Sequence, residues 1–517
     1  MTIRRRLAAV GALGAALAAL LAVPAAATPT AATPTTDPAV VATDKGAVRG
    51  TVTDGSRSYQ GIPYAAPPVG DLRWRSPRPA AAWSGVRDAT KPGDACAQPA
   101  GLPIGVPSEH EDCLYLNVTA PAHADGDTPV IVWIHGGSLM FGTGDMYRPA
   151  RLSRDAVVVS MNYRLGVLGF LTDDALDAGS AYGSGSLGIE DQQAALRWVR
   201  RNIAGFGGDP HNVTIMGQSG GGYSVCDQLA SPTAAGLFDR AIVESAPCVG
   251  DATRTRAAAE AESAAVVAKV GCVDDPDRAA CLRAVPPARL LAAYGADKEP
   301  RPVAGTRLLP RTPAAAFRSG RFNRVPVLVV VNHDEERGQV AGQELATGKP
   351  MTAEEYEQAI RARFGADADT VLARYPLSPG DSPGAQLGDV LTDANWSVPT
   401  LDTATALSRW TPTRVAEFAE QDTPWFAGTP RTSFPVRAQH MSELPYLFDL
   451  SLFEPLTPAR AALGDRMIDT WTGFAATGRT AWPTYTRSNR YVESIASGPW
   501  RRADVEGEHD YRFWSGL

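Results

Sequence analysis

The chain has 517 residues, of which 44% are hydrophobic and 20% charged, and its net charge is −7 at pH 7. This is the composition of a globular protein with a large core, and it excludes a collagen-like, coiled-coil or multi-span membrane protein. A mildly acidic chain without a basic block is also a poor nucleic-acid binder, because that affinity comes mainly from neutralising phosphates.

The first 27 residues have the pattern of a secretory signal peptide. Arginines at positions 4–6 precede an uncharged run over residues 7–23, which is followed by three alanines at 25–27. A cationic start, an apolar middle and an Ala-x-Ala end are typical of a peptide that is cleaved on export. The alternative, a membrane anchor, is disfavoured because the run is at the short limit for spanning a bilayer. We therefore expect a secreted protein without stable membrane insertion, and the consecutive arginines permit the twin-arginine route.

Six cysteines are expected to form disulfides, because export places them in an oxidising compartment. Pairing of nearest neighbours along the chain gives Cys96–Cys113, Cys226–Cys248 and Cys272–Cys281. The alternative is a set of free buried thiols. No metal site is expected, because the sequence has no Cys-x-x-Cys and no paired histidine spacing.

Four continuous apolar runs predict strands that are buried on both faces of a parallel sheet. The runs lie at residues 130–134, 156–161, 213–216 and 327–331. Residues 191–202 and 224–229 show helical patterns. Strands that alternate with helices are typical of a doubly wound α/β fold.

The rest of the chain is predicted to be a short lead-in followed by one domain. Residues 28–43 are rich in Ala, Thr and Pro and are expected to be disordered. Residues 44–517 are expected to form a single α/β domain. Helix-rich insertions over residues 261–283 and 353–375 are expected to cap its sheet.

A candidate nucleophile, Ser219, lies in the sequence Gly217-Gln218-Ser219-Gly220-Gly221, which directly follows the third predicted strand and opens a helix. Gly-x-Ser-x-Gly alone is a weak match. Between a buried strand and a helix, however, it predicts a tight, strained turn that exposes the serine oxygen. The alternative is a glycine-rich turn with an incidental serine.

A serine hydroxyl is a weak nucleophile at neutral pH and needs an adjacent base that a third group orients. In sheets of this type the chain order is serine, then acid, then histidine, which leaves His333, His440 and His509. His509 lies in a polar segment and is expected to be solvated, and His333 belongs to a carboxylate cluster that follows the fourth strand. We therefore predict His440 as the base.

The acid is expected at the end of the fourth predicted strand, where parallel strands present such groups. Three carboxylates follow one another there: Asp334, Glu335 and Glu336. Local chemistry does not separate them, and each also fits a solvated charge that ends a strand.

Donors for a tetrahedral oxyanion are expected from the loop His135-Gly136-Gly137-Ser138, which follows a strand upstream of the serine. The backbone amide of Gly220 is the other expected donor. Each such donor lowers the barrier by about 3 kcal/mol. The alternative for the loop is an ordinary glycine turn.

These motifs, together with several others, resemble the type-B carboxylesterases, the family that contains cholinesterases and many bacterial esterases. The matching segments run in the same order over about residues 46–482. They include residues 60–68, 72–74, 111–118, 162–166, 187–192, 206–210, 440–448 and 471–474. Several long motifs in the right order make the resemblance highly specific.

The resemblance implies an α/β-hydrolase fold, with a large, mostly parallel central sheet flanked by helices and with helical insertions. It implies that Ser219 is the nucleophile and His440 the base. It selects Glu335 as the acid, because the family pattern is Asp-Glu-Gly, although Glu336 here replaces the glycine. It also places the oxyanion donors at the amides of Gly137, Ser138 and Gly220, and implies disulfides Cys96–Cys113 and Cys272–Cys281 and an ion pair between Arg73 and Glu111.

The implied reaction is hydrolysis of a carboxylic ester through an acyl-enzyme, with water as the second substrate and no metal or organic cofactor. A choline ester would need an aromatic cage, yet residues 97–112 contain no Phe, Tyr or Trp. The same short loop gives little of the lid expected of a lipase. We therefore expect a carboxylesterase for small to medium esters. The alternatives are a hydrolase of another acyl bond (amide, carbamate, lactone or polyester) and, from a different class, a binding module.

Overall fold

The structure, a computed structural model, describes residues 37–101, 103–250 and 253–517. Residues 39–517 form one compact unit, whereas the predicted signal peptide and most of the predicted lead-in lie outside the described residues. Residues 40–42, which we expected to be disordered, instead form strand β1 (Val40–Ala42), which pairs with β2 (Ala47–Arg49). Val41 is buried, so the folded chain begins before residue 44 because this strand contributes to the core.

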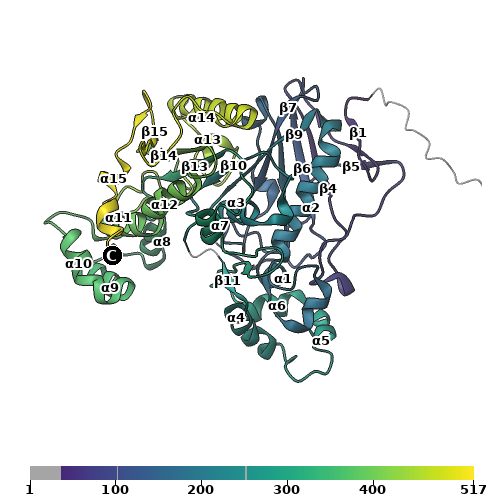
Figure 1. The fold of residues 1–517 in the computed structure, drawn as a ribbon, viewed down its shortest axis with the longest axis horizontal. Helices are drawn as coiled ribbons and strands as arrows, with labels where there is room; N and C mark the ends of the chain where they lie inside the picture. The colour runs from purple at the N-terminus through teal and green to yellow at the C-terminus, as the bar shows by residue number, and fades with distance from the viewer. Residues whose placement is uncertain (1–36, 102, 251–252) are drawn as a thin grey trace, which may run out of the picture. The chain divides into compact units, whose positions relative to one another are not determined.

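A mixed sheet of 11 strands forms the centre of this unit (Figure 1), in the order β16-β15-β14-β13-β10-β9-β7-β8-β6-β4-β3. The strands from β15 to β8 in this order run parallel, and the strands at the two edges are antiparallel. Their bounds are β3 (Thr51–Val52), β4 (Ser56–Pro63), β6 (Tyr115–Pro121), β7 (Thr128–Ile134), β8 (Val157–Met161), β9 (Gly208–Gln218), β10 (Arg240–Glu244), β13 (Val327–Asn332), β14 (Thr413–Phe418), β15 (Glu493–Ile495) and β16 (Arg501–Arg502). This confirms the predicted α/β fold with a large, mostly parallel sheet.

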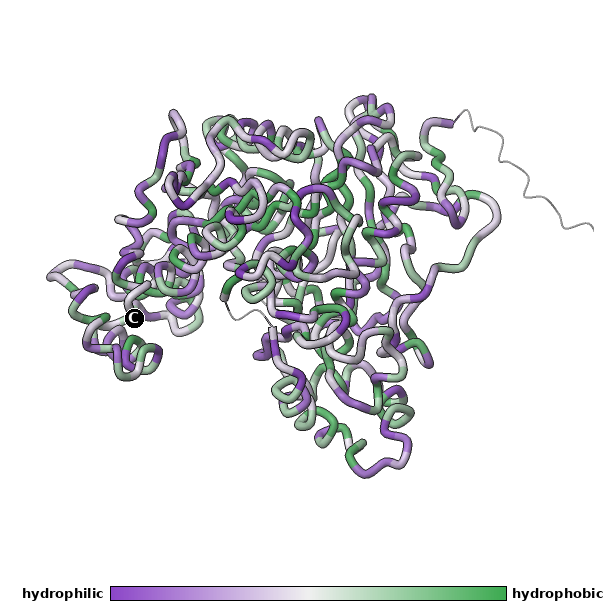
Figure 2. The backbone as a smooth tube through the Cα atoms, viewed as in Figure 1, coloured by the Kyte–Doolittle hydropathy of each residue, from purple (hydrophilic) through white to green (hydrophobic). Residues whose placement is uncertain are grey.

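Each of the four predicted strands is present, as β7, β8, β9 and β13. All residues of β8 and β13 are buried, because helices cover both faces of a parallel sheet. Figure 2 shows the apolar residues concentrated on these central strands. Two smaller sheets accompany the main one. They are β1-β2-β5, with β5 at Val86–Asp88, and β11-β12, at Arg254–Thr255 and Val303–Ala304.

Helices flank the sheet and build the two predicted insertions. The α-helices are α1 (Gly166–Phe170), α2 (Leu187–Asn202), α3 (Gly220–Ala230), α4 (Arg256–Lys269), α5 (Arg278–Ala284), α6 (Pro287–Tyr294), α7 (Pro313–Ser319), α8 (Arg337–Thr347), α9 (Ala353–Phe364), α10 (Ala368–Arg374), α11 (Pro383–Thr392), α12 (Val398–Leu407), α13 (Leu444–Leu447), α14 (Pro458–Thr477), α15 (Val505–Glu508) and α16 (Tyr511–Trp514). Helix α4 of the first predicted insertion contacts α6, which packs on α1, and α9 of the second insertion contacts α11. In Figure 1 both insertions lie away from the sheet, so the expectation that they cap it is wrong. Among the described residues, no helix combines the length and apolarity needed to cross a bilayer.

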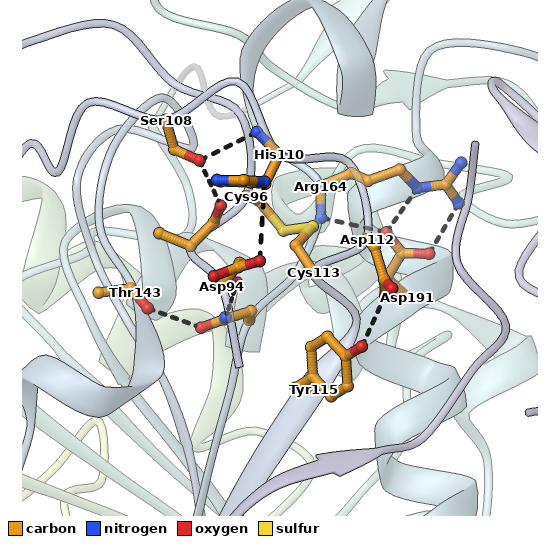
Figure 3. The surroundings of a disulfide bond; sticks show 12 residues. Asp94, Cys96, Ser108, His110, Asp112, Cys113, Tyr115, Thr143, Arg164 and Asp191 are labelled. Carbon is orange, nitrogen blue, oxygen red and sulfur yellow. Dashed lines mark hydrogen bonds and ion pairs between the residues drawn. A yellow bond between two sulfur atoms is a disulfide. The ribbon is translucent and has the colours of Figure 1, made fainter. Parts of the chain in front are cut away.

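The structure pairs all six cysteines as predicted, in Cys96–Cys113, Cys226–Cys248 and Cys272–Cys281. Figure 3 shows the first of these disulfides. Polar contacts surround it. They include the ion pair of Arg164 with Asp191, at 2.7 Å, and the hydrogen bond that the Tyr115 hydroxyl donates to Asp112, also at 2.7 Å. The implied ion pair is also present, with Arg73 Nε 2.6 Å from Glu111 Oε1.

Candidate active site

Ser219 lies in the turn between β9 and α3, with backbone angles φ 55° and ψ −124°. A positive φ is strained for a residue with a side chain, and the surrounding backbone holds it there. The Ser219 amide donates to the carbonyl of Glu244 at 3.0 Å. A Cβ at Gly221 would lie 1.9 Å from the carbonyl oxygen of Ile134, so only glycine lets the helix start this close to β7.

The Ser219 hydroxyl is hydrogen-bonded to His440, whose Nε2 lies 2.8 Å from Ser219 Oγ. The other ring nitrogen of His440, Nδ1, lies 2.6 Å from Glu335 Oε2. Glu335 is 1% exposed, and its second oxygen accepts the amide of Asn332 at 2.9 Å. The imidazole is therefore placed to take the serine proton at one nitrogen while a buried carboxylate holds the other nitrogen.

The strand ends position these groups. Glu335 follows β13, and His440 lies in the loop before α13. Two hydrogen bonds join these two segments, and a third joins the His440 loop to the end of β9. The His440 amide donates to the Glu335 carbonyl at 3.1 Å, Asn332 Nδ2 donates to the Gln439 carbonyl at 2.8 Å, and Gln218 Nε2 donates to the His440 carbonyl at 2.5 Å. The imidazole is thus fixed by backbone as well as by side-chain contacts.

The charge around His440 favours its protonated form. Burial alone would lower the pKa of His440, but Glu335, Glu443 and Glu336 outweigh it and raise the pKa above the usual 6.5. An imidazole with a raised pKa is a stronger proton acceptor, and its imidazolium form is stabilised once the serine proton arrives.

Of the three carboxylates after β13, only Glu335 contacts His440. Asp334 instead faces His333, Arg337 and Arg437, at 3.2, 3.3 and 3.8 Å. Burial would raise the pKa of Asp334, but these three partners outweigh it and lower the pKa. Glu336 turns to a different partner, the indole of Trp396.

Two residues close to His440 were not found by the sequence reasoning. Glu443 is fully buried and accepts a hydrogen bond from Asn332 Nδ2 at 2.5 Å. Burial raises the pKa of Glu443 to about 8. Trp396 packs its ring on the His440 imidazole. Glu443 lies inside a segment that carries the family resemblance, whereas no sequence signal marks Trp396.

The predicted oxyanion donors lie beside the serine. The loop after β7 has positive φ angles at Gly137 (100°), Ser138 (54°) and Leu139 (59°). A Cβ at Gly220 would lie 2.9 Å from the Ser138 nitrogen, so the loop and the first turn of α3 approach closely. Within the described part of the chain, the amides of Gly137 and Ser138 have no protein acceptor. The Gly220 amide opens α3 and has no intrahelical partner.

His509, expected to be solvated, is buried with 3% of its surface exposed. The C-terminal helices fold back over the sheet, and His509 lies between Asp393, 2.5 Å from Nδ1, and Glu417, 2.8 Å from Nε2. The ligand atoms of His333, Glu417 and His509 lie within 4.8 Å of one another, close enough to hold a cation. Both ring nitrogens of His509 are already hydrogen-bonded to carboxylates. His509 therefore links the C-terminal segment to β14 through ion pairs.

The ion pairs of His509 predict that the stability of the protein depends on pH. Burial would lower the pKa of His509, but Asp393 and Glu417 outweigh it and raise the pKa well above 6.5. Its contribution to stability is therefore full below about pH 6.5 and is lost as the pH rises through the higher folded-state pKa. His509→Gln removes the cation that bridges the buried carboxylates of Asp393 and Glu417, and we expect it to lower the free energy of unfolding by about 3–5 kcal/mol near pH 6.

Thermal melts at several pH values check this prediction. The difference in melting temperature between the wild-type protein and the His509→Gln variant should shrink as the pH rises. His123→Gln, at an exposed position, is the matched control and should melt like the wild-type protein throughout. A difference for His509→Gln that stays constant with pH would contradict a charged His509.

Comparisons with known proteins place this chain among esterases. The family model described as "Carboxylesterase family" matches residues 37–514. The chain is 34% identical to the para-nitrobenzyl esterase of Bacillus subtilis (strain 168), over 91% of this chain and 97% of that protein. It is 36% identical to a cocaine esterase of Oryctolagus cuniculus, over 87% of this chain and 91% of that protein. Among solved structures, a PNB esterase superposes with a TM-score of 0.77 at 32% identity, covering 92% of this chain and 100% of its own.

Proposed function

The chain belongs to the carboxylesterase family and is a carboxylesterase, and from this premise we propose that Ser219, His440 and Glu335 are its catalytic residues. One observation carries the proposal: a single imidazole joins the serine hydroxyl at 2.8 Å to a buried carboxylate at 2.6 Å. The strained backbone of Ser219, which presents the hydroxyl at the end of β9, supports the same assignment.

The proposed reaction has two halves. In the first, Ser219 Oγ attacks the ester carbonyl carbon while His440 Nε2 takes the hydroxyl proton, and the resulting oxyanion accepts hydrogen bonds from the amides of Gly137, Ser138 and Gly220. The C–O bond to the alcohol then breaks, and His440 returns the proton to the departing alcohol. In the second half, water repeats these steps on the acyl-enzyme and releases the acid. Glu335 holds the imidazole in orientation and stabilises its protonated form throughout.

We propose small to medium carboxylic esters as the substrates. The loop closed by Cys96 and Cys113 has no aromatic residue for a quaternary cation and is too short to form a large apolar lid. The relatives named as a para-nitrobenzyl esterase and a cocaine esterase, each matched over most of its length, support esters as the class.

A substrate panel tests this class. Initial rates are measured on nitrophenyl esters from acetate to palmitate, alongside nitroanilides, a carbamate, a lactone and a polyester. We expect kcat/KM to be highest for short and medium acyl chains and far lower for the long chains, the nitroanilides, the carbamate, the lactone and the polyester. A higher value for the anilides, the carbamate, the lactone or the polyester would place the enzyme in the alternative class of acyl-bond hydrolases.

We also propose that the protein is secreted after cleavage behind Ala27. Three disulfides support export, because such bonds persist in oxidising compartments. The mature protein is then one carboxylesterase domain whose folded part begins close to residue 39.

A further inference from the structure

Glu336 occupies an unusual position for a carboxylate directly beside the proposed catalytic acid. It is 9% exposed, and its amide donates to Thr392 Oγ1 at 3.0 Å, which fixes the start of α8 against the end of α11. Its side-chain Oε1 accepts the indole N–H of Trp396 at 2.6 Å. Burial raises the pKa of Glu336, and the Trp396 hydrogen bond and the charge of His440 oppose that rise. The indole N–H of Trp396 therefore holds the Glu336 carboxylate at a buried position, where burial disfavours the charged form.

Trp396 contacts both Glu336 and His440. Its ring centroid lies 4.6 Å from that of the His440 imidazole, with the planes inclined by 53°. The two nitrogens of His440 contact Ser219 and Glu335, and the tilted indole packs against the same imidazole ring. A ring face at this distance attracts a cation, and His440 becomes a cation when it takes the serine proton.

The backbone under Trp396 is also specialised. Trp396 lies in a single π-helical turn, η8 (Asp393–Ser397), inserted between α11 and α12. Such turns shift the direction of the side chains they carry. The turn is anchored at its first residue, because Asp393 accepts the Tyr375 hydroxyl at 2.7 Å and contacts His509 at 2.5 Å. The position of the indole is therefore set by the anchored backbone of this turn as well as by the hydrogen bond to Glu336.

We propose that Glu336 and Trp396 act as a positioning pair for His440, in which the carboxylate orients the indole and the indole holds the imidazole and stabilises its protonated form. The inference rests on the proposed role of His440 as the base. Neither residue touches the reacting atoms, so both act through His440. An acceptor on the indole N–H also makes the ring face more negative, which strengthens its attraction for the imidazolium.

The test measures the pH dependence of kcat/KM for Glu336→Gln, Trp396→Phe and Trp396→Leu with a short-chain nitrophenyl ester. Three carboxylates raise the pKa of His440 (Glu335, Glu443 and Glu336), and Glu336→Gln removes one negative charge. The pKa of His440 should fall, so the acid limb of the profile should move to lower pH, by up to about one unit. Trp396→Leu should lower kcat about tenfold with little change in KM, because the attraction for the imidazolium is lost.

The conservative variants test whether the two residues act as a pair. Trp396→Phe keeps a ring on His440 but removes the donor to Glu336, so it should retain most of kcat and move the acid limb in the same direction as Glu336→Gln. The double variant Glu336→Gln/Trp396→Phe should then show little further change, which is the signature of two residues acting in one interaction. Additive effects of the two changes would overturn the pairing.

Matched controls are Trp410→Phe, at a tryptophan that is 39% exposed, and Glu354→Gln, at an exposed carboxylate of α9. Both should keep the wild-type profile, and melting temperatures are recorded for every variant, so that activity is compared only among folded proteins. Ser219→Ala is measured alongside. If it is inactive while the Glu336 and Trp396 variants keep the wild-type kcat and acid limb, the positioning pair is wrong and the triad stands. If Ser219→Ala keeps full activity, the proposed catalytic triad is wrong, and the positioning pair loses its basis with it.

Discussion

Replacing Ser219 with alanine is expected to lower kcat on a short nitrophenyl ester by about a million-fold, the scale of loss when a catalytic serine is removed. The reason is that, within residues 37–101, 103–250 and 253–517, Ser219 supplies the one hydroxyl bonded to His440, so without it no acyl-enzyme forms. The melting temperature should hardly change. The hydroxyl makes one hydrogen bond, to a partly exposed histidine, and alanine keeps the Cβ on the strained backbone.

Two measurements check this outcome. Steady-state rates give the loss in kcat, and labelling with a fluorophosphonate followed by peptide mapping identifies the modified residue. The wild-type protein should carry the label on Ser219 and the variant none. Ser84→Ala, at an exposed serine, should be labelled and active like the wild-type protein. Full activity of the Ser219→Ala variant would remove the basis of the assignment.

Glu335→Gln is expected to lower kcat by about ten-thousand-fold. The amide that replaces the carboxylate brings no negative charge to the imidazolium, and its orientation is free to present a donor where an acceptor is needed at Nδ1. Because Glu335 contributes most to raising the pKa of His440, its loss should also move the acid limb of the kcat/KM profile to lower pH.

The neighbouring variant Glu336→Gln is the matched comparison for this prediction. It removes the same charge from the adjacent residue, yet Glu336 contacts Trp396 and not an imidazole nitrogen. Its effect on kcat should therefore be smaller by orders of magnitude. A greater loss from Glu336→Gln than from Glu335→Gln would show that the wrong carboxylate had been chosen as the acid.

The predicted strands that proved correct share one property. The runs that became β7, β8, β9 and β13 are continuous and apolar, and helices cover both of their faces. Two other central strands, β10 and β14, were not predicted. β14 contains the buried charges Arg414 and Glu417, so it shows no apolar run. The groups that pair with these charges come from segments far away in the sequence. For Glu417 that partner is His509, and the same pairing explains why His509 was wrongly expected to be solvated.

The sequence by itself determined what depends on neighbours along the chain. Apolar runs specify buried strands, the glycines around Ser219 specify the turn, and cysteines close in sequence specify the three disulfides. Local chemistry left three adjacent carboxylates open and the family resemblance selected Glu335, but the tertiary structure decided the contact itself, in which Glu335 reaches His440 Nδ1. It also decided that Trp396 packs on the imidazole ring. Consecutive residues of a turn point in different directions, and the backbone path that fixes those directions depends on contacts with segments far away in sequence. No local pattern records these contacts, because they exist only once the sheet has brought the strand ends together.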